Sequence, residues 1–273
     1  MPIVAMTYEA GAQGKEVASH VAEKSGLDLA CHRMFEQQVA ERLHANRKRV
    51  HRFLQGKPGL LDRLITDQGA VAVYTAEQVY ELASRGDVLI CGWGATHLLR
   101  PVAHVLCVRI CAPIDHRVAV LMEWLGIGEE EAYATIAESD AARAATMRDL
   151  APDDGTAYDL VLDTARVPVA ECVTEITRLL GEPVLQETAE SRGKLNALRR
   201  EAQVRAALRA DAATAGVGSF VKVITDPYNG RIALEGAVQT YELKGNAERV
   251  VAALPWVSKV ENHLHVVGPC RLE

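Results

Sequence analysis

The sequence lacks the features that mark membrane, secreted and disulfide-bonded proteins. No apolar run approaches the ~20 residues that a helix needs to span a bilayer. The first residues lack the basic segment of a secretory signal. The six cysteines include no C-x-x-C pair, and several fall in apolar runs. We therefore expect reduced, buried thiols in a cytoplasmic protein that has no metal site of its own.

The composition is that of a globular protein with two dissimilar parts. The chain has 273 residues, 49% of them hydrophobic, and a mean hydropathy near zero. Residues 1–190 carry 18 Lys and Arg against 28 Asp and Glu, whereas residues 191–273 carry 12 against 8. This asymmetry predicts two units with different surfaces.

A short glycine-containing loop near the start of the chain is the strongest local signal. The apolar run 3–6 leads into the loop, and a helical pattern begins immediately after its last glycine. Glycines allow consecutive N–H groups to point inward, and a helix N-terminus with a nearby lysine adds positive charge. The residues of this candidate phosphate site are Gly11, Ala12, Gln13, Gly14, Lys15 and Glu16.

The loop departs from a standard P-loop at two positions. Glu9 stands where the first glycine belongs, and Glu16 stands where a magnesium-binding hydroxyl belongs. A strand-to-helix turn that uses glycine only for steric reasons would show the same pattern. The residues alone leave both interpretations open.

Apolar runs alternate with helical patterns through the first two thirds of the chain. The runs 88–91, 105–110 and 159–163 are typical of strands buried on both faces. This α/β order predicts a parallel sheet flanked by helices, with ligands at the carboxyl ends of its strands.

The last third follows a different order of helix, strand, strand, helix and strand. Its strands show a single apolar face, which predicts a small α+β unit. We expect a first domain over 1–182, a linker over 183–194 and a second domain over 195–269.

Two clusters of polar residues are interpreted as solvent-exposed surface. The basic run 47–52 is typical of a charged helix face, although it could also hold a nucleotide or another polyanion. His263 and His265 share one strand face without a third metal ligand nearby. We expect no nucleic-acid partner.

The first 180 residues resemble the cytidylate kinase-like family of P-loop nucleoside monophosphate kinase relatives. The resemblance runs in order through the glycine loop and the segments 88–95, 108–117, 140–144 and 158–164. It implies a mobile helical lid, ATP and Mg²⁺ as cofactors, and a nucleoside monophosphate such as CMP or dCMP as acceptor. It also implies that the ATP phosphates lie at the glycine loop.

The resemblance also suggests which cations act in catalysis. Phosphoryl transfer between two anions needs cations that converge on the transferring oxygens. The candidates are Lys15, Arg117 and Arg143. Asp140 lies three residues before Arg143 on the same lid face, where it can orient the arginine.

Several positions differ from the family pattern. Trp93 replaces the arginine that usually lies between two glycines, Cys31 and His32 replace an acid and a lysine, and the lid lacks its tyrosine. Glu16 could block magnesium, or Asp163 could supply the missing ligand. An active kinase and a catalytically silent nucleotide-binding sensor or scaffold therefore both remain open.

Residues 196–268 resemble a BON domain in their element order and in Gly236. The resemblance implies a small binding module for localisation or regulation, with an anionic phospholipid or a protein as its partner. Four arginines of its first helix could meet anionic headgroups or form a solvated basic face: Arg199, Arg200, Arg205 and Arg209.

Overall fold

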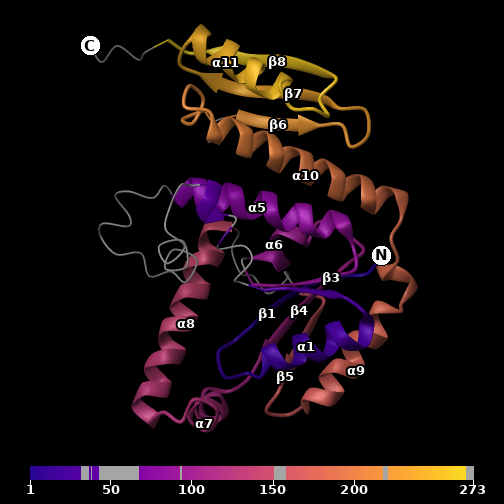
Figure 1. Ribbon diagram of the computed structural model, residues 1–273, viewed down its shortest axis with the longest axis vertical. Helices are drawn as coiled ribbons and strands as arrows, with labels where there is room; N and C mark the ends of the chain where they lie inside the picture. Colours follow the sequence, from indigo (N-terminus) through magenta and orange to yellow (C-terminus); the bar gives the residue numbers. More distant parts are fainter. Residues whose placement is uncertain are drawn as a thin grey trace. The chain divides into compact units, whose positions relative to one another are not determined.

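The computed structural model describes residues 1–31, 37, 39–42, 68–92, 94–150, 158–217 and 221–268 (Figure 1). The chain forms two compact units, Met1–Ser191 and Arg192–Glu273. None of the helices in the described part combines the length and apolar character that a bilayer-spanning segment requires.

Five parallel strands in the order β2-β3-β1-β4-β5 form the sheet of the first unit. Ile3 of the central strand is in register with Val88 on one side and Val105 on the other. The predicted parallel sheet is thus confirmed. The strands are β1 (Ile3–Tyr8), β2 (Asp28–Ala30), β3 (Val88–Cys91), β4 (Val105–Cys111) and β5 (Leu160–Asp163).

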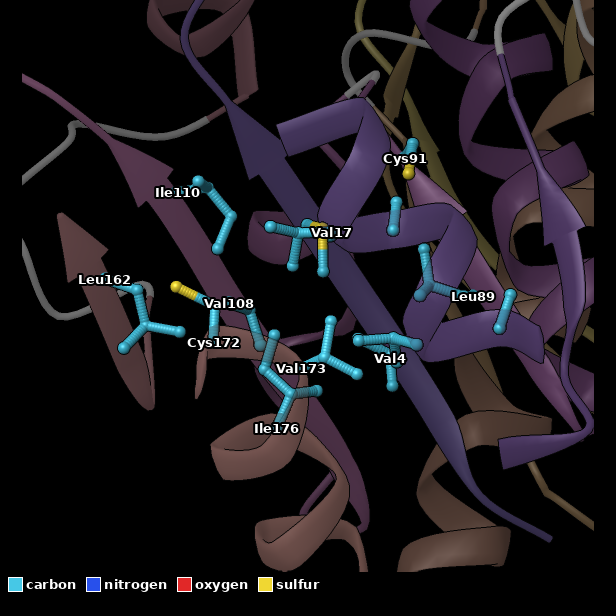
Figure 2. Packing of buried hydrophobic residues seen from close by; sticks show 14 of the residues in the cluster. Val4, Val17, Leu89, Cys91, Val108, Ile110, Leu162, Cys172, Val173 and Ile176 are labelled. Carbon is cyan, nitrogen blue, oxygen red and sulfur yellow. The ribbon is translucent and has the colours of Figure 1, made fainter. Parts of the chain in front are cut away.

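Helices cover both faces of this sheet, with α1 and α9 on one face and α5 and α6 on the other (Figure 1). These helices are α1 (Gly14–Ser25), α5 (Gln68–Arg85), α6 (Ala95–Leu99) and α9 (Val169–Leu180). Figure 2 shows the core between the sheet and the first pair, where Val17, Val173 and Ile176 point toward Val4 and Val108. This core fixes the start of α1 against the end of β1.

Two further helices form the region that the sequence predicts as a lid. They are α7 (Ile114–Leu125) and α8 (Glu129–Leu150). Their contact has a small core of its own, made by Val118, Leu121, Ala132 and Ile136. Gly126 ends α7 in the left-handed conformation, with φ of 65°, and so lets the chain reverse between the helices.

The second unit has the predicted order of helix, strand, strand, helix and strand. β7 lies in the middle of its sheet, antiparallel to β6 and parallel to β8, and one face packs on an apolar core. The elements are α10 (Ala189–Ala210), β6 (Val221–Thr225), β7 (Arg231–Val238), α11 (Tyr241–Ala252) and β8 (Lys259–Val266).

The segment 183–194, expected as a linker, contains the short 3₁₀ helix η1 (Pro183–Leu185) and the first residues of α10. Thr188 and Ser191 form reciprocal hydrogen bonds at the start of α10, because each side-chain oxygen accepts from the other residue's backbone N–H. This capping box starts the helix inside the segment that the sequence analysis assigns to the linker.

Candidate functional site

The glycine loop joins the carboxyl end of β1 to the N-terminus of α1. Gly11 has φ of 82°, and a Cβ there would lie 2.4 Å from the Arg117 carbonyl oxygen. A Cβ at Gly14 would lie 2.2 Å from Cβ of Tyr8. No side chain fits at either glycine, so steric requirements account for both residues.

The start of α1 has backbone N–H groups without an intrahelical acceptor. The N–H groups of Glu16 and Val17 both donate to the Gln13 carbonyl, at 3.1 Å. Gly14 and Lys15 are the first two residues of α1, where N–H groups have no intrahelical acceptor. These amides and the positive end of the helix dipole favour an anion at the loop.

A pocket of about 500 Å³ opens in front of these donors. Lys15 and the exposed Trp124 face each other in it, with the lysine Nζ 5.9 Å from the centre of the indole ring. The lining residues come from the loop region and from α7: Tyr8, Glu9, Ala10, Gly11, Gln13, Gly14, Lys15, Glu16, Val120, Leu121, Glu123 and Trp124.

Arg117 lies behind the loop and is 5% exposed. Its Nε donates to the Ala10 carbonyl at 2.7 Å, and its two terminal nitrogens donate to both Asp140 oxygens at 2.9 and 3.0 Å. Arg143 donates to the same carboxylate at 3.3 Å. The structure therefore joins the loop to α8 through Arg117 and Asp140.

The pKa of Asp140 reflects these contacts. Partial burial alone would raise the pKa, but the hydrogen bonds and charge of Arg117, together with Arg143, outweigh burial and hold it below its usual range. Asp140 is thus a carboxylate at neutral pH and keeps both arginines oriented.

Glu9 forms a second centre of charge, which the sequence analysis does not predict. Its carboxylate is buried and accepts from Arg109 at 2.8 Å, while Arg117 and Arg143 lie 3.5 and 3.6 Å away. The Ala112 N–H also donates to it, at 3.4 Å. In the sequence, Glu9 stands out only as a departure from the glycine motif. The signal that could have identified its partner is Arg109, a cation within the apolar run that forms β4.

Thr164 anchors the loop from the other side. Its buried hydroxyl lies 3.1 Å from the Ala12 carbonyl and 3.4 Å from the Cys111 carbonyl. Asp163 accepts from the Ala165 N–H at 3.0 Å in the turn that follows β5. The carboxyl ends of β4 and β5 therefore hold the loop in place.

The candidate cations fall into two groups. Arg117 and Arg143 meet at Asp140 and Glu9, whereas Lys15 lies in the pocket beside Trp124. Arg143 is the more accessible arginine, with 23% of its side chain exposed against 6% for Arg117. Trp93, His32 and the basic run 47–52 lie outside the described residues.

Magnesium would depend on a bound ligand as well as on the protein. In the described part of the chain, no three His, Cys, Asp or Glu side chains lie close enough to hold a metal ion. Glu16 is exposed and lines the pocket next to Lys15. One carboxylate plus phosphate oxygens is a common environment for Mg²⁺, so the residues present fit a nucleotide-borne ion.

A glycine loop at the carboxyl edge of a parallel sheet, with a two-helix lid, defines a P-loop kinase-like fold. Residues 3–166 match the cytidylate kinase-like family, and the chain belongs to this family. Residues 197–268 match the BON domain. Among curated proteins, none matches the chain significantly.

Comparison with solved structures gives matches at low sequence identity. An uncharacterized protein from Eubacterium ventriosum is 17% identical with a TM-score of 0.52, covering 66% of this chain and 98% of its own. Shikimate kinase from Acinetobacter baumannii, in complex with shikimate, is 14% identical with a TM-score of 0.40 and coverages of 66% and 93%. Shikimate kinase from Bacteroides thetaiotaomicron is 14% identical with a TM-score of 0.41, and the match covers 66% of this chain and 99% of that kinase.

Proposed function

We propose that the first unit binds ATP and transfers a phosphoryl group to a nucleoside monophosphate, CMP or dCMP by family resemblance. The observation that carries this proposal is the pocket between the glycine loop and α7, which contains Lys15 and the helix N-terminus. Its volume of about 500 Å³ is within the usual range of small-molecule sites.

The loop and Lys15 would hold the phosphates of ATP. The amides of Gly14 and Lys15 donate to phosphate oxygens, and the lysine ammonium group neutralises part of their charge. Trp124 and the adjoining face of α7 restrict access of water from one side. Bound Mg²⁺ would supply further positive charge at the phosphates, with Glu16 as the nearest protein carboxylate.

Arg143 is the lid cation best placed to act during transfer. It extends from α8 to Glu9, and its partial exposure leaves it within reach of solvent. Arg117 instead donates hydrogen bonds to Ala10 and Asp140 and forms an ion pair with Glu9, so its role is to hold the lid against the loop.

Phosphoryl-transfer assays across a panel of monophosphates test this activity. The wild-type protein should phosphorylate at least one acceptor, and Lys15→Ala should lower the rate by about 10³. Lys24→Ala, an exposed lysine near the end of the same helix, is the matched control and should leave the rate unchanged. No turnover with any acceptor would refute the enzymatic proposal.

A catalytically silent nucleotide sensor or scaffold is the second candidate. The engagement of Arg117 in structural contacts favours it, as does Trp93 in place of the family arginine, because both reduce the number of cations available for transfer. This candidate predicts ATP binding without turnover, whereas a pure scaffold predicts neither.

We infer that the BON unit localises or regulates the first unit through an anionic phospholipid or a protein partner. Three arginines of α10 already contact carbonyls of their own unit: Arg200 that of Asp226, Arg205 that of Val221 and Arg209 that of Ala215. The Arg200 guanidinium carbon also lies 5.0 Å from the centre of the Trp256 ring. These contacts use part of the donor capacity of the three arginines, and each guanidinium has further N–H groups that an anionic partner could contact. Flotation of the full chain with phosphatidylglycerol vesicles but not with phosphatidylcholine vesicles would indicate a lipid partner, whereas no flotation with either would favour a protein partner.

A further inference from the structure

Glu9 poses an electrostatic problem for a site that holds phosphates. Glu9 is one of the residues that line the same pocket as Gly14 and Lys15, yet only 8% of it is exposed. An unpaired carboxylate beside a polyphosphate would repel it, because like charges interact strongly where water is scarce.

The protein nevertheless gains a structural contact from Glu9. The carboxylate accepts from the Ala112 N–H, which follows β4, and the Glu9 N–H donates to the Ile110 carbonyl at 3.1 Å. Glu9 thus attaches the loop to the end of the neighbouring strand. The attachment requires a side-chain oxygen but no negative charge.

Arg109 is the guanidinium closest to that charge. Its Nη2 lies 2.8 Å from Glu9 Oε1, closer than Arg117 or Arg143, and both of those also share Asp140. Arg109 belongs to β4, and its guanidinium carbon lies 5.7 Å from the centre of the Tyr158 ring. It therefore contacts Glu9 from a fixed position on the sheet. Arg109 does not line the pocket.

We propose that Arg109 is a positioning residue that neutralises Glu9 and so makes the glycine loop able to accept a polyphosphate. This inference rests on the proposed nucleotide binding. It assigns Arg109 an effect on phosphate affinity that acts through Glu9 and not through contact with the ligand.

Calorimetric titration of the full chain with ATP and ADP tests the proposal through four proteins. They are the wild type, Arg109→Met, Arg109→Lys and the double variant Glu9→Gln with Arg109→Met. Arg178→Met, alone and with Glu175→Gln, is the matched control, because that ion pair on α9 is exposed and lies outside the pocket. Thermal unfolding of each protein confirms that it is folded.

Arg109→Met should weaken ATP binding by about tenfold and ADP binding by less, because repulsion from Glu9 grows with ligand charge. The double variant should return to within about threefold of the wild type. Arg109→Lys should lose less affinity than Arg109→Met, because lysine keeps the positive charge although it loses the planar group that stacks on Tyr158. A purely structural role would lower the affinity for both nucleotides equally.

Equal losses for ATP and ADP, or a double variant as weak as Arg109→Met, would overturn the inference while leaving the proposed function intact. Failure of the wild type to bind either nucleotide would overturn both. If Arg109→Met does not fold, the double variant decides the matter, because it must still bind ATP within about threefold of the wild type.

Discussion

At the scale of single residues, charges around the glycine loop determine what the site can bind. Glu9 and Asp140 contribute two negative charges, and Arg109, Arg117 and Arg143 contribute three positive ones. The cluster is therefore slightly positive and mostly self-compensated. Lys15, on the pocket side of the loop, adds a cation outside this network.

Asp140→Asn should destabilise the first unit by roughly 1–2 kcal/mol at neutral pH, since Arg117 would lose its bidentate partner. The partial exposure of Asp140 keeps this value modest. Because folding lowers the pKa of Asp140, its stabilising effect is complete above the unfolded pKa of about 3.9 and is lost as the pH falls through the lower folded value.

Denaturant unfolding of the wild type and Asp140→Asn at pH 7 and at low pH measures this difference. The gap between the two proteins should narrow as Asp140 becomes protonated. Glu175→Gln, in an exposed pair, is the control and should have little effect at either pH. A gap that stays constant with pH would show that ionisation of Asp140 does not stabilise the fold.

Gly11→Ala should lower the free energy of unfolding by roughly 1–3 kcal/mol and reduce ATP affinity by about tenfold or more. The new Cβ would collide with the Arg117 carbonyl, and the backbone φ of 82° is unfavourable for alanine. Gly128→Ala has open space around its Cβ and serves as the control. Wild-type ATP affinity in Gly11→Ala would refute the described loop geometry.

Residue chemistry was only partly predictable from the sequence. The pairing of Asp140 with Arg143 followed from helical spacing, because residues three apart share a helix face, but the bidentate contact of Asp140 with Arg117 was not predicted. The contacts of Glu9 did not, because they join positions 100 and more residues apart in the chain. Only the order of strands in the sheet brings Arg109 next to β1.

At the scale of elements, the sheet was predictable because buried parallel strands are continuous apolar runs. The run 88–91 coincides with β3, and 105–110 falls one residue short of β4. α5 begins at Gln68, whereas the helical spacing of apolar residues in the sequence is clear only from Thr75 onward. Ala70, Val71 and Tyr74 are buried, so packing extends a helix whose first turn contains the weak helix former Gly69.

α10 shows the opposite difficulty, in which a glycine resembles a break. Gly193 suggested a loop, yet it lies inside the helix. A Cβ at this position would lie 2.7 Å from the Tyr228 hydroxyl oxygen, which is the far end of an exposed side chain that can move aside. Sequence patterns do not distinguish a glycine inside a helix from a glycine at a helix terminus, because the same residue occurs in both places.

The lid should behave as a separate packing unit, because α7 and α8 share a small core of their own. Ile136→Ala should cost about 2–4 kcal/mol and should reduce hydrogen-exchange protection in α8 while β1 stays protected. Ile114→Ala, at an exposed position of α7, is the control and should change little. Equal loss of protection in α8 and β1 would show that the lid and sheet unfold together.

At the scale of the whole molecule, a kinase-like unit and a BON unit occur in one chain. The element order of each unit was predictable, since short-range periodicity determines it. The function of the first unit depends on whether its glycine loop holds a polyphosphate, and every proposal for that unit rests on this point.

Thermal unfolding of the full chain with and without MgATP tests that point most directly. ATP at 100 times its dissociation constant should add about 2.7 kcal/mol to the stability of the folded wild type and of the Lys24→Ala control. Lys15→Ala should lose most of this gain. Equal stabilisation of Lys15→Ala and the wild type, or no stabilisation of the wild type, would contradict the assignment of the loop as a phosphate site.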